Sequence, residues 1–301
     1  MQNKQQPQPC QTIRENCRSI FGNPKPPAVI WQQQFDGLDL TPLISKDCNK
    51  LTNADLYDYW DDLAYVKELQ PDLFQYLFPI CLAVWHEELM QHRLITPPYF
   101  YQTLQRCKVT KGLMSEQQRQ GVYHYMCDAL IGLIEQEHDF AYAYMHTPVY
   151  TWTDTFNNLG ALAPVIESLW LRWWVLDNHG KAISALKYAS GLIYGSNENP
   201  LFPPWTREEG GGPPNLADMD TTCFKEGWLP ENLLFLRETL SAGYICDKLA
   251  QAAAVLRDTP ESETATRIAS DAQQRQDIIT IRIEEVTYGL QYPSMSLEWN
   301  N

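Results

Sequence analysis

The sequence predicts an all-α fold, a multi-helix bundle or array that carries a long Gly/Pro-rich loop and a C-terminal helical hairpin. Apolar residues recur at spacings of three and four along most of the chain, which is the period of an amphipathic helix. Several of these runs begin at Ser or Thr residues that fit helix N-caps. Hydrophobic residues make up 44% of the 301 residues, so the chain has ample apolar surface to bury and we expect it to be globular.

Changes in composition divide the chain into four predicted segments. Residues 1–9 are rich in Gln and Pro and are expected to form a disordered tail, and residues 10–194 are expected to form a helical domain. Residues 195–228 contain a run of three glycines and five prolines, which predicts a long loop. Such a loop is a candidate binding element, and a loop without a role is the alternative. Residues 229–292 are expected to form a helical hairpin packed on the same unit.

Start and stop signals place the first predicted helices. A helix over residues 10–21 is expected to end at Gly22, because glycine readily adopts the left-handed conformation that closes a helix. Thr52 and Asp55 stand three residues apart and precede apolar residues at helical spacing, so they fit a capping box. A helix is therefore expected to begin at this point.

Two longer helices are predicted further along the same segment. Pro71 is expected to open one of them, and Pro79 is expected to kink or restart it, because proline lacks the backbone N–H of the helical ladder. Ser115 and Gln118 fit a second capping box. From there the helical pattern is expected to continue and to stop before Pro148.

The remaining helices include the predicted centre of the core. Residues 162–176 contain three tryptophans and are apolar nearly all round, so they are predicted to form the central helix, with Gly180 near its C-terminal cap. Two helices over residues 230–257 and 260–290 are expected to form the hairpin. Three isoleucines that alternate with polar residues around residue 281 also fit a strand, but the longer helical register outweighs this alternative.

The chain is strongly acidic, with a formal net charge of −14 from 37 Asp and Glu against 23 Lys and Arg. This charge opposes binding to nucleic acid and to anionic membrane surfaces. The excess acid is concentrated in residues 54–80, 194–231 and 258–285, which are either solvated faces or a docking surface for a basic partner. No signal peptide or membrane span is predicted, and the eight cysteines lack CxxC spacing. We therefore expect a cytoplasmic protein with reduced thiols.

Two pairs of residues resemble parts of catalytic sites. Glu135 and His138 fit half of a carboxylate-bridged di-iron signature, but the sequence contains no second Glu-x-x-His. His124 and Cys127 lie one helical turn apart as base and nucleophile, yet a free cysteine among such apolar neighbours is typical of a core thiol. No metal site and no cofactor are therefore predicted.

One stretch carries a resemblance to known proteins. Within residues 56–80, the run LYDYWDDLAYVKELQPDLFQYLFP resembles a segment of small uncharacterised bacterial helical proteins, some of them immunity-like. In these proteins an aromatic helix is followed by a Phe-x-Tyr-x-Leu-Pro-like run. The stretch covers under a tenth of the chain. It contains no catalytic residue, and the resemblance implies a bacterial binding protein.

The clustered acids predict an interaction protein rather than an enzyme. We expect a cytoplasmic protein-binding or inhibitory protein, in its most concrete form an immunity protein that neutralises a basic toxin through an acidic surface. The alternative is a helical enzyme with a small-molecule or metal site near the Trp-rich helix and the Gly/Pro loop, using Glu135, His138 or Glu208. The predicted partner-binding residues are Asp58, Asp61, Asp62, Trp205, Glu208, Glu209, Asp218, Asp220 and Trp228.

Overall fold

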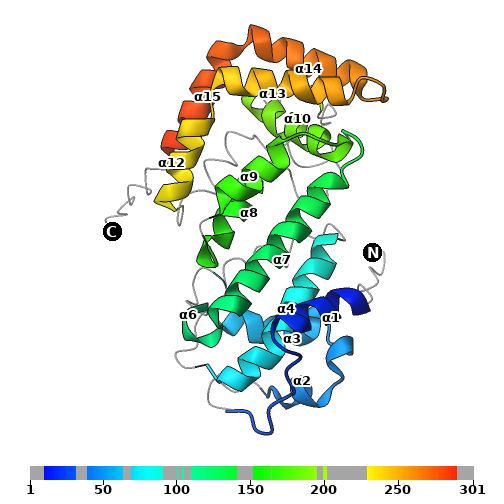
Figure 1. The fold of residues 1–301 in the computed structure, drawn as a ribbon, viewed down its shortest axis with the longest axis vertical. Coiled ribbons are helices and arrows are strands. Elements are labelled where there is room, and N and C mark those ends of the chain that lie inside the picture. Colours follow the sequence, from blue (N-terminus) through cyan, green and yellow to red (C-terminus); the bar gives the residue numbers. More distant parts are fainter. Residues whose placement is uncertain are drawn as a thin grey trace, which may run out of the picture. The chain divides into compact units, whose positions relative to one another are not determined.

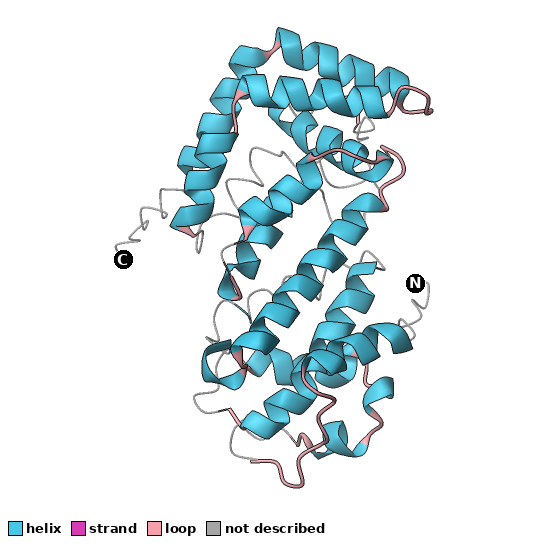
Figure 2. Cartoon of the chain, in the orientation of Figure 1, coloured by secondary structure: helices cyan, strands magenta, loops and turns pink. Residues whose placement is uncertain are grey.

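The computed structural model describes residues 10–31, 39–63, 69–90, 100, 104, 110–140, 152–163, 165–194, 199–201 and 229–289. Over these residues all regular structure is helical and no strand is present (Figures 1 and 2). The predicted all-α fold class is therefore confirmed. The predicted tail and nearly all of the predicted loop at 195–228 lie outside the described residues.

The chain forms two compact units. Unit 1 comprises residues 1–130, 145–147 and 158–163, and unit 2 comprises residues 131–144, 148–157 and 164–301. One boundary between the units falls inside a helix, α7 (Glu116–Glu135). The helices that follow the predicted loop belong to the same unit as those directly before it.

Unit 1 is organised around one long apolar helix. It contains α1 (Gln11–Ile20), α2 (Thr41–Ser45), the 3-10 helix η2 (Cys48–Lys50), α3 (Asn53–Asp62), α4 (Pro71–Met90), α6 (Thr110–Leu113), α7 up to Leu130 and the 3-10 helix η4 (Leu159–Ala161). Helices α1 and α3 pack against α4. Phe74 and Phe78 of α4 stack with ring centroids 4.8 Å apart inside this core.

The local start and stop signals of unit 1 form as predicted. The N–H of Ser115 donates to Oε1 of Gln118 at 2.8 Å, and the N–H of Gln118 donates to Oγ of Ser115 at 3.2 Å, so the capping box of α7 is reciprocal. The N–H of Thr52 donates to Oδ2 of Asp55 at 2.7 Å, which confirms the capping box of α3. Helix α1 ends where expected, and Gly22 follows with a φ of 73°.

Pro79 does not restart the helix, so of the two expected outcomes, a kink or a restart, the restart is wrong. It lies inside α4, which runs for 20 residues from Pro71 to Met90. An interior proline removes one ladder hydrogen bond and costs about 3 kcal/mol. Burial of almost every residue of α4 between Leu73 and Leu89 offsets that loss, because apolar side chains gain more from leaving water than one hydrogen bond contributes.

Unit 2 contains the C-terminal helices and the tryptophan cluster. Its helices are α8 (Trp152–Asn158) up to Asn157, α9 (Ile166–Trp174), α10 (His179–Ile193), α12 (Pro230–Thr239), α13 (Ala242–Val255), α14 (Ser262–Gln274) and α15 (Gln276–Gly289). Helices α13 and α14 lie side by side as a hairpin, and α10 packs against α13, α14 and α15 (Figure 1). The tryptophans of α9 are buried in this core.

The central helix of unit 2 is α10, which corrects the assignment of that role to residues 162–176. Every residue of α10 from Gly180 to Ile193 is buried, whereas α9 leaves Leu171 56% and Val175 45% exposed. Gly180 is not the cap of α9 either, because it lies in the first turn of α10. The residue that leaves α9 with a positive φ, of 53°, is Leu176.

The C-terminal region contains more helices than the two predicted. The pattern over 230–257 is interrupted between α12 and α13, where Oγ of Ser241 accepts the N–H of Tyr244 at 3.1 Å and so caps a new helix. The pattern over 260–290 is interrupted at Arg275, between α14 and α15. Within α15 the three isoleucines are helical, so the strand alternative is wrong.

Candidate functional site

The structure describes few of the predicted partner-binding residues. Asp58 is exposed on α3, beside the exposed ring of Tyr57. Asp61 and Asp62 lie in the last turn of α3, and their side chains are outside the described set. The predicted residues that lie wholly outside the described part of the chain are Trp205, Glu208, Glu209, Asp218, Asp220 and Trp228.

Of the three residues of the alternative enzyme site, Glu135 and His138 are described and have different partners, and Glu208 lies outside the described residues. The Glu135 carboxylate forms an ion pair with Nζ of Lys181 at 3.1 Å. His138 is exposed, and its Nε2 lies 3.3 Å from Oδ2 of Asp139. Among the described residues, no group of three or more His, Cys, Asp and Glu is placed to hold a metal ion. Glu135 and His138 therefore lie beside different charged groups, the Lys181 ammonium and the Asp139 carboxylate, respectively.

The predicted base and nucleophile also separate. His124 is exposed on α7, whereas Cys127 is buried on the core side of the same helix. A nucleophilic thiol needs access to its substrate and a base within hydrogen-bond reach. This burial pattern supports the interpretation of Cys127 as a core thiol.

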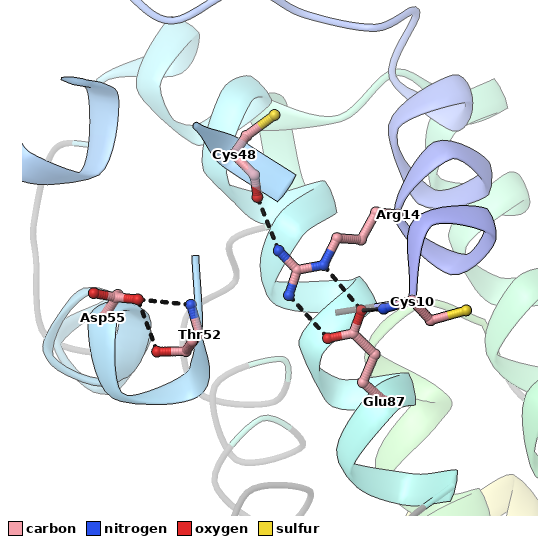
Figure 3. Close-up of polar contacts among 6 residues, drawn as sticks. All are labelled: Cys10, Arg14, Cys48, Thr52, Asp55 and Glu87. Atoms are coloured by element: carbon pink, nitrogen blue, oxygen red, sulfur yellow. Dashed lines mark hydrogen bonds and ion pairs between the residues drawn. The ribbon is translucent and has the colours of Figure 1, made fainter. Parts of the chain in front are cut away.

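A buried ion pair, which sequence reasoning missed, joins three elements of unit 1 (Figure 3). Nε and Nη2 of Arg14 on α1 donate to the two oxygens of Glu87 on α4, each at 2.9 Å. The two residues are only 2% and 5% exposed. The third donor of Arg14, Nη1, bonds the carbonyl of Cys48 in η2 at 2.9 Å. The arginine thus holds α1, α4 and η2 together.

Glu87 also accepts a hydrogen bond from the backbone at the N-terminus of α1. The backbone N–H of Cys10, the N-cap residue, donates to Oε1 of Glu87 at 2.7 Å. Helix α1 has no acidic residue in its own first turn, so the carboxylate that favours the positive end of its dipole comes from α4. The sequence signal was the pair Glu87 and Glu88 near the end of the mainly apolar helix α4, because a charge buried there must be paired.

A second group of polar side chains, partly buried, is formed by residues of α1, α4 and α7. Nδ1 of His86 is hydrogen-bonded to the hydroxyl of Tyr125, and burial lowers the pKa of His86. Burial raises the pKa of the Cys17 thiol to about 12, against the opposing effect of its hydrogen bond with Tyr125. A thiol with such a pKa stays protonated at neutral pH and is a poor nucleophile. This group is therefore suited to packing rather than to catalysis.

Exposed carboxylates outnumber exposed basic side chains on the described surface of helices α12–α15, and two of their arginines turn inward. Nη2 of Arg237 donates to the carbonyl of Thr287 at 3.1 Å, and Arg275 lies over the ring of Tyr194 with its Cζ 5.2 Å from the centroid. Both arginines are half-buried, and the exposed basic side chains described on these helices and their connections are Arg257 and Arg267. The exposed carboxylates described there are Glu231, Glu238, Asp247, Asp258, Glu263, Asp277 and Glu284.

Comparison with known proteins identifies no relative of this chain. No protein-family model, curated protein or solved structure matches the chain. The resemblance of residues 56–80 to immunity-like proteins stays a prediction. Within the described helices, none has both the length and the apolar character that a membrane span requires. The case for a function therefore comes from the side chains of this protein alone.

Proposed function

We propose that this chain is a protein-binding protein that recognises a basic partner through the acidic outer surface of α12–α15. The observation that carries the proposal is the sorting of charge on these helices, with carboxylates exposed and Arg237 and Arg275 turned onto the unit itself. Exposed like charges repel one another and attract an oppositely charged partner. Such a surface raises the rate of association with a basic protein and weakens as salt is added.

The proposal includes the more specific form reached from the sequence. The partner is a basic toxin or effector, and this chain inhibits it as an immunity protein in the cytoplasm. Asp58, on α3 of unit 1, is a further exposed carboxylate. Buried free thiols such as Cys17 and Cys81 support a reducing compartment, in which thiols are retained.

Affinity capture from an extract of the native host tests this proposal. The full chain is used as bait at about 50 mM and about 500 mM salt, because the screening length falls from well above 10 Å to a few ångströms over that range. We expect a basic protein to be recovered at low salt and largely lost at high salt. Recovery that is indifferent to salt, or no recovered protein, contradicts the proposal.

Two double variants with the same change in net charge test whether binding depends on this surface or on the overall charge of the chain. Glu238→Gln with Glu284→Gln removes two exposed carboxylates from α12 and α15 and is expected to weaken capture several-fold. Glu15→Gln with Asp128→Asn removes the same charge from exposed positions in unit 1. Equal losses from the two pairs would show that overall charge, rather than this surface, governs binding.

A further inference from the structure

The outer face of α15 combines apolar and acidic side chains. Ile279, Ile283 and Thr287 are buried and mark the inner side of the helix. At about 100° per residue, Ile278 and Ile281 point about 140–160° away from that side. They are 42% and 55% exposed. Asp277 and Glu284, both exposed, flank the two isoleucines along the helix.

The neighbouring helix α12 repeats this arrangement. Leu233 and Leu236 are buried on its inner side, whereas Leu234 is 54% exposed. Glu231 and Glu238 are exposed on the same side as Leu234, one turn before and one turn after it. Helices α12 and α15 lie side by side and are in contact (Figure 1).

The fold itself does not require isoleucine at these outer positions. Isoleucine is a poorer helix former than alanine or glutamate, and an exposed side chain contributes little burial to folding. Single exposed apolar residues are ordinary on protein surfaces. Here Ile278 and Ile281 point within about 60° of one another on α15 and stand between two exposed carboxylates, which is the pattern of an apolar anchor site with a charged rim.

We propose that the outer face of α15, defined by Ile278 and Ile281 with the flanking Asp277 and Glu284, docks a basic amphipathic helix of the partner protein. Leu234 and the exposed acids of the neighbouring helix α12 extend the contact. The proposal rests on the proposed function and names the contact that the partner makes. An amphipathic helix places apolar side chains at spacings of three and four, which match an apolar stripe, and its Lys and Arg residues meet the acidic rim.

Charge complementarity favours this occupant over the others. A second copy of the chain would bring carboxylates against carboxylates, which is repulsive. The segment that follows α15, residues 290–301, contains Glu298 and neither Lys nor Arg. Neither occupant supplies the positive charge that the rim requires.

Binding of two synthetic peptides to the full chain tests the proposal. The first is a helix-forming peptide of about 18 residues, or five turns, with Leu on one face and Lys on the other. The second has the same composition in scrambled order. Fluorescence anisotropy near physiological salt is expected to show the amphipathic peptide binding at least about tenfold more tightly. Amide hydrogen exchange is expected to show protection of α12 and α15 on binding.

Two variants locate the contact. Ile278→Ala with Ile281→Ala is expected to abolish the difference between the peptides. Leu171→Ala with Val175→Ala removes the exposed apolar pair of α9 and its C-cap in the same unit and is expected to preserve the difference between the peptides. Thermal unfolding of both variants checks that each retains the fold.

Each contrary outcome has a defined meaning. If the two peptides bind equally and Glu238→Gln with Glu284→Gln weakens both, the proposed function stands and the docking face is refuted. If neither peptide binds, the docking face is refuted, and the salt-dependent capture experiment alone decides the proposed function. A dimer in sedimentation that Ile278→Ala with Ile281→Ala dissociates would assign the face to a second copy. Tighter peptide binding after truncation at Gly289 would assign the face to residues 290–301, and either assignment overturns the inference.

Discussion

Replacing Glu87 by Gln tests the buried ion pair of unit 1 most directly. The substitution keeps the shape of the side chain but leaves the Arg14 guanidinium, 2% exposed, without a counter-charge. At an effective dielectric constant of 20, two charges about 4 Å apart attract by about 4 kcal/mol. Breaking one partner of a buried pair costs about 3–5 kcal/mol, which agrees with that value. We therefore expect a loss of stability in this range.

Amide hydrogen exchange under native conditions measures this loss where it occurs. The opening free energy of peptides from α1 and α4 is expected to fall in the Glu87→Gln variant, because Arg14 and the N–H of Cys10 both lose the carboxylate. Lys46→Gln is the matched control. Its ion pair with Asp55 has a similar length, 2.8 Å, but is partly exposed, so about 0–1 kcal/mol is expected.

A double substitution distinguishes the net contribution of the ion pair to the free energy of unfolding from the cost of leaving one buried charge without its partner. Arg14→Met with Glu87→Met removes both charges, and apolar replacements of buried pairs are often neutral. The double variant is expected to recover at least about 2 kcal/mol relative to the sum of the single variants. Additive losses, or a Glu87→Gln variant no less stable than Lys46→Gln, would refute the view that Arg14 and Glu87 depend on one another.

Two further predictions concern a close backbone contact and a buried imidazole. A Cβ at Gly180 would stand 2.2 Å from the carbonyl oxygen of Glu135, so Gly180→Ala is expected to cost about 1–3 kcal/mol or more in thermal unfolding. Gly132→Ala, with open space around its Cβ, is expected to stabilise α7 by about 0.5–1 kcal/mol, and equal effects would contradict this contrast. Burial lowers the pKa of His86 below its usual 6.5, so the unfolded chain binds the proton more readily. The resulting stability is complete above about pH 6.5 and is lost as the pH falls below it. His86→Gln is expected to flatten the stability profile in that range, and an unaltered profile would exclude His86 as its source.

Local signals in the sequence predicted helix boundaries well where the partners are close in the chain. The pairs Thr52 with Asp55 and Ser115 with Gln118 form capping boxes because each needs only one helical turn to fold. Gly22 closes α1 for the same reason. These interactions are decided before any tertiary contact is made.

The sequence failed where distant parts of the chain decide the structure. Gly180 appeared to be a helix cap, but its role is to let α10 approach the carbonyl of Glu135, which lies 45 positions earlier. Glu87 bonds Arg14 across 73 positions. Helix periodicity records which face of a helix is apolar and not which element covers it, so neither contact is visible from spacing.

The candidate surface was predictable in charge but not in arrangement. Residues 258–285 were singled out for their excess acid, which the structure places largely outward. The inward turn of Arg237 and Arg275 was not visible in the sequence, because it depends on the carbonyl of Thr287 and the ring of Tyr194. Net charge predicted an acidic docking surface, and the orientation of Arg237 and Arg275 indicates that the outer side of α12–α15 is a candidate for it.

The buried ion pairs of both units do not reduce the excess negative charge of the chain. Arg14 with Glu87, and Lys187 with Glu137 at 2.6 Å, each remove one acid and one base from the surface, so the net charge of −14 is unchanged. The acids outnumber the basic side chains by fourteen, and an unpaired carboxylate is costly to bury, so most of this excess is expected to face solvent or a partner. Their mutual repulsion opposes the folded state at low salt, and a basic partner relieves it. The same excess charge that costs stability in the free protein therefore contributes to binding.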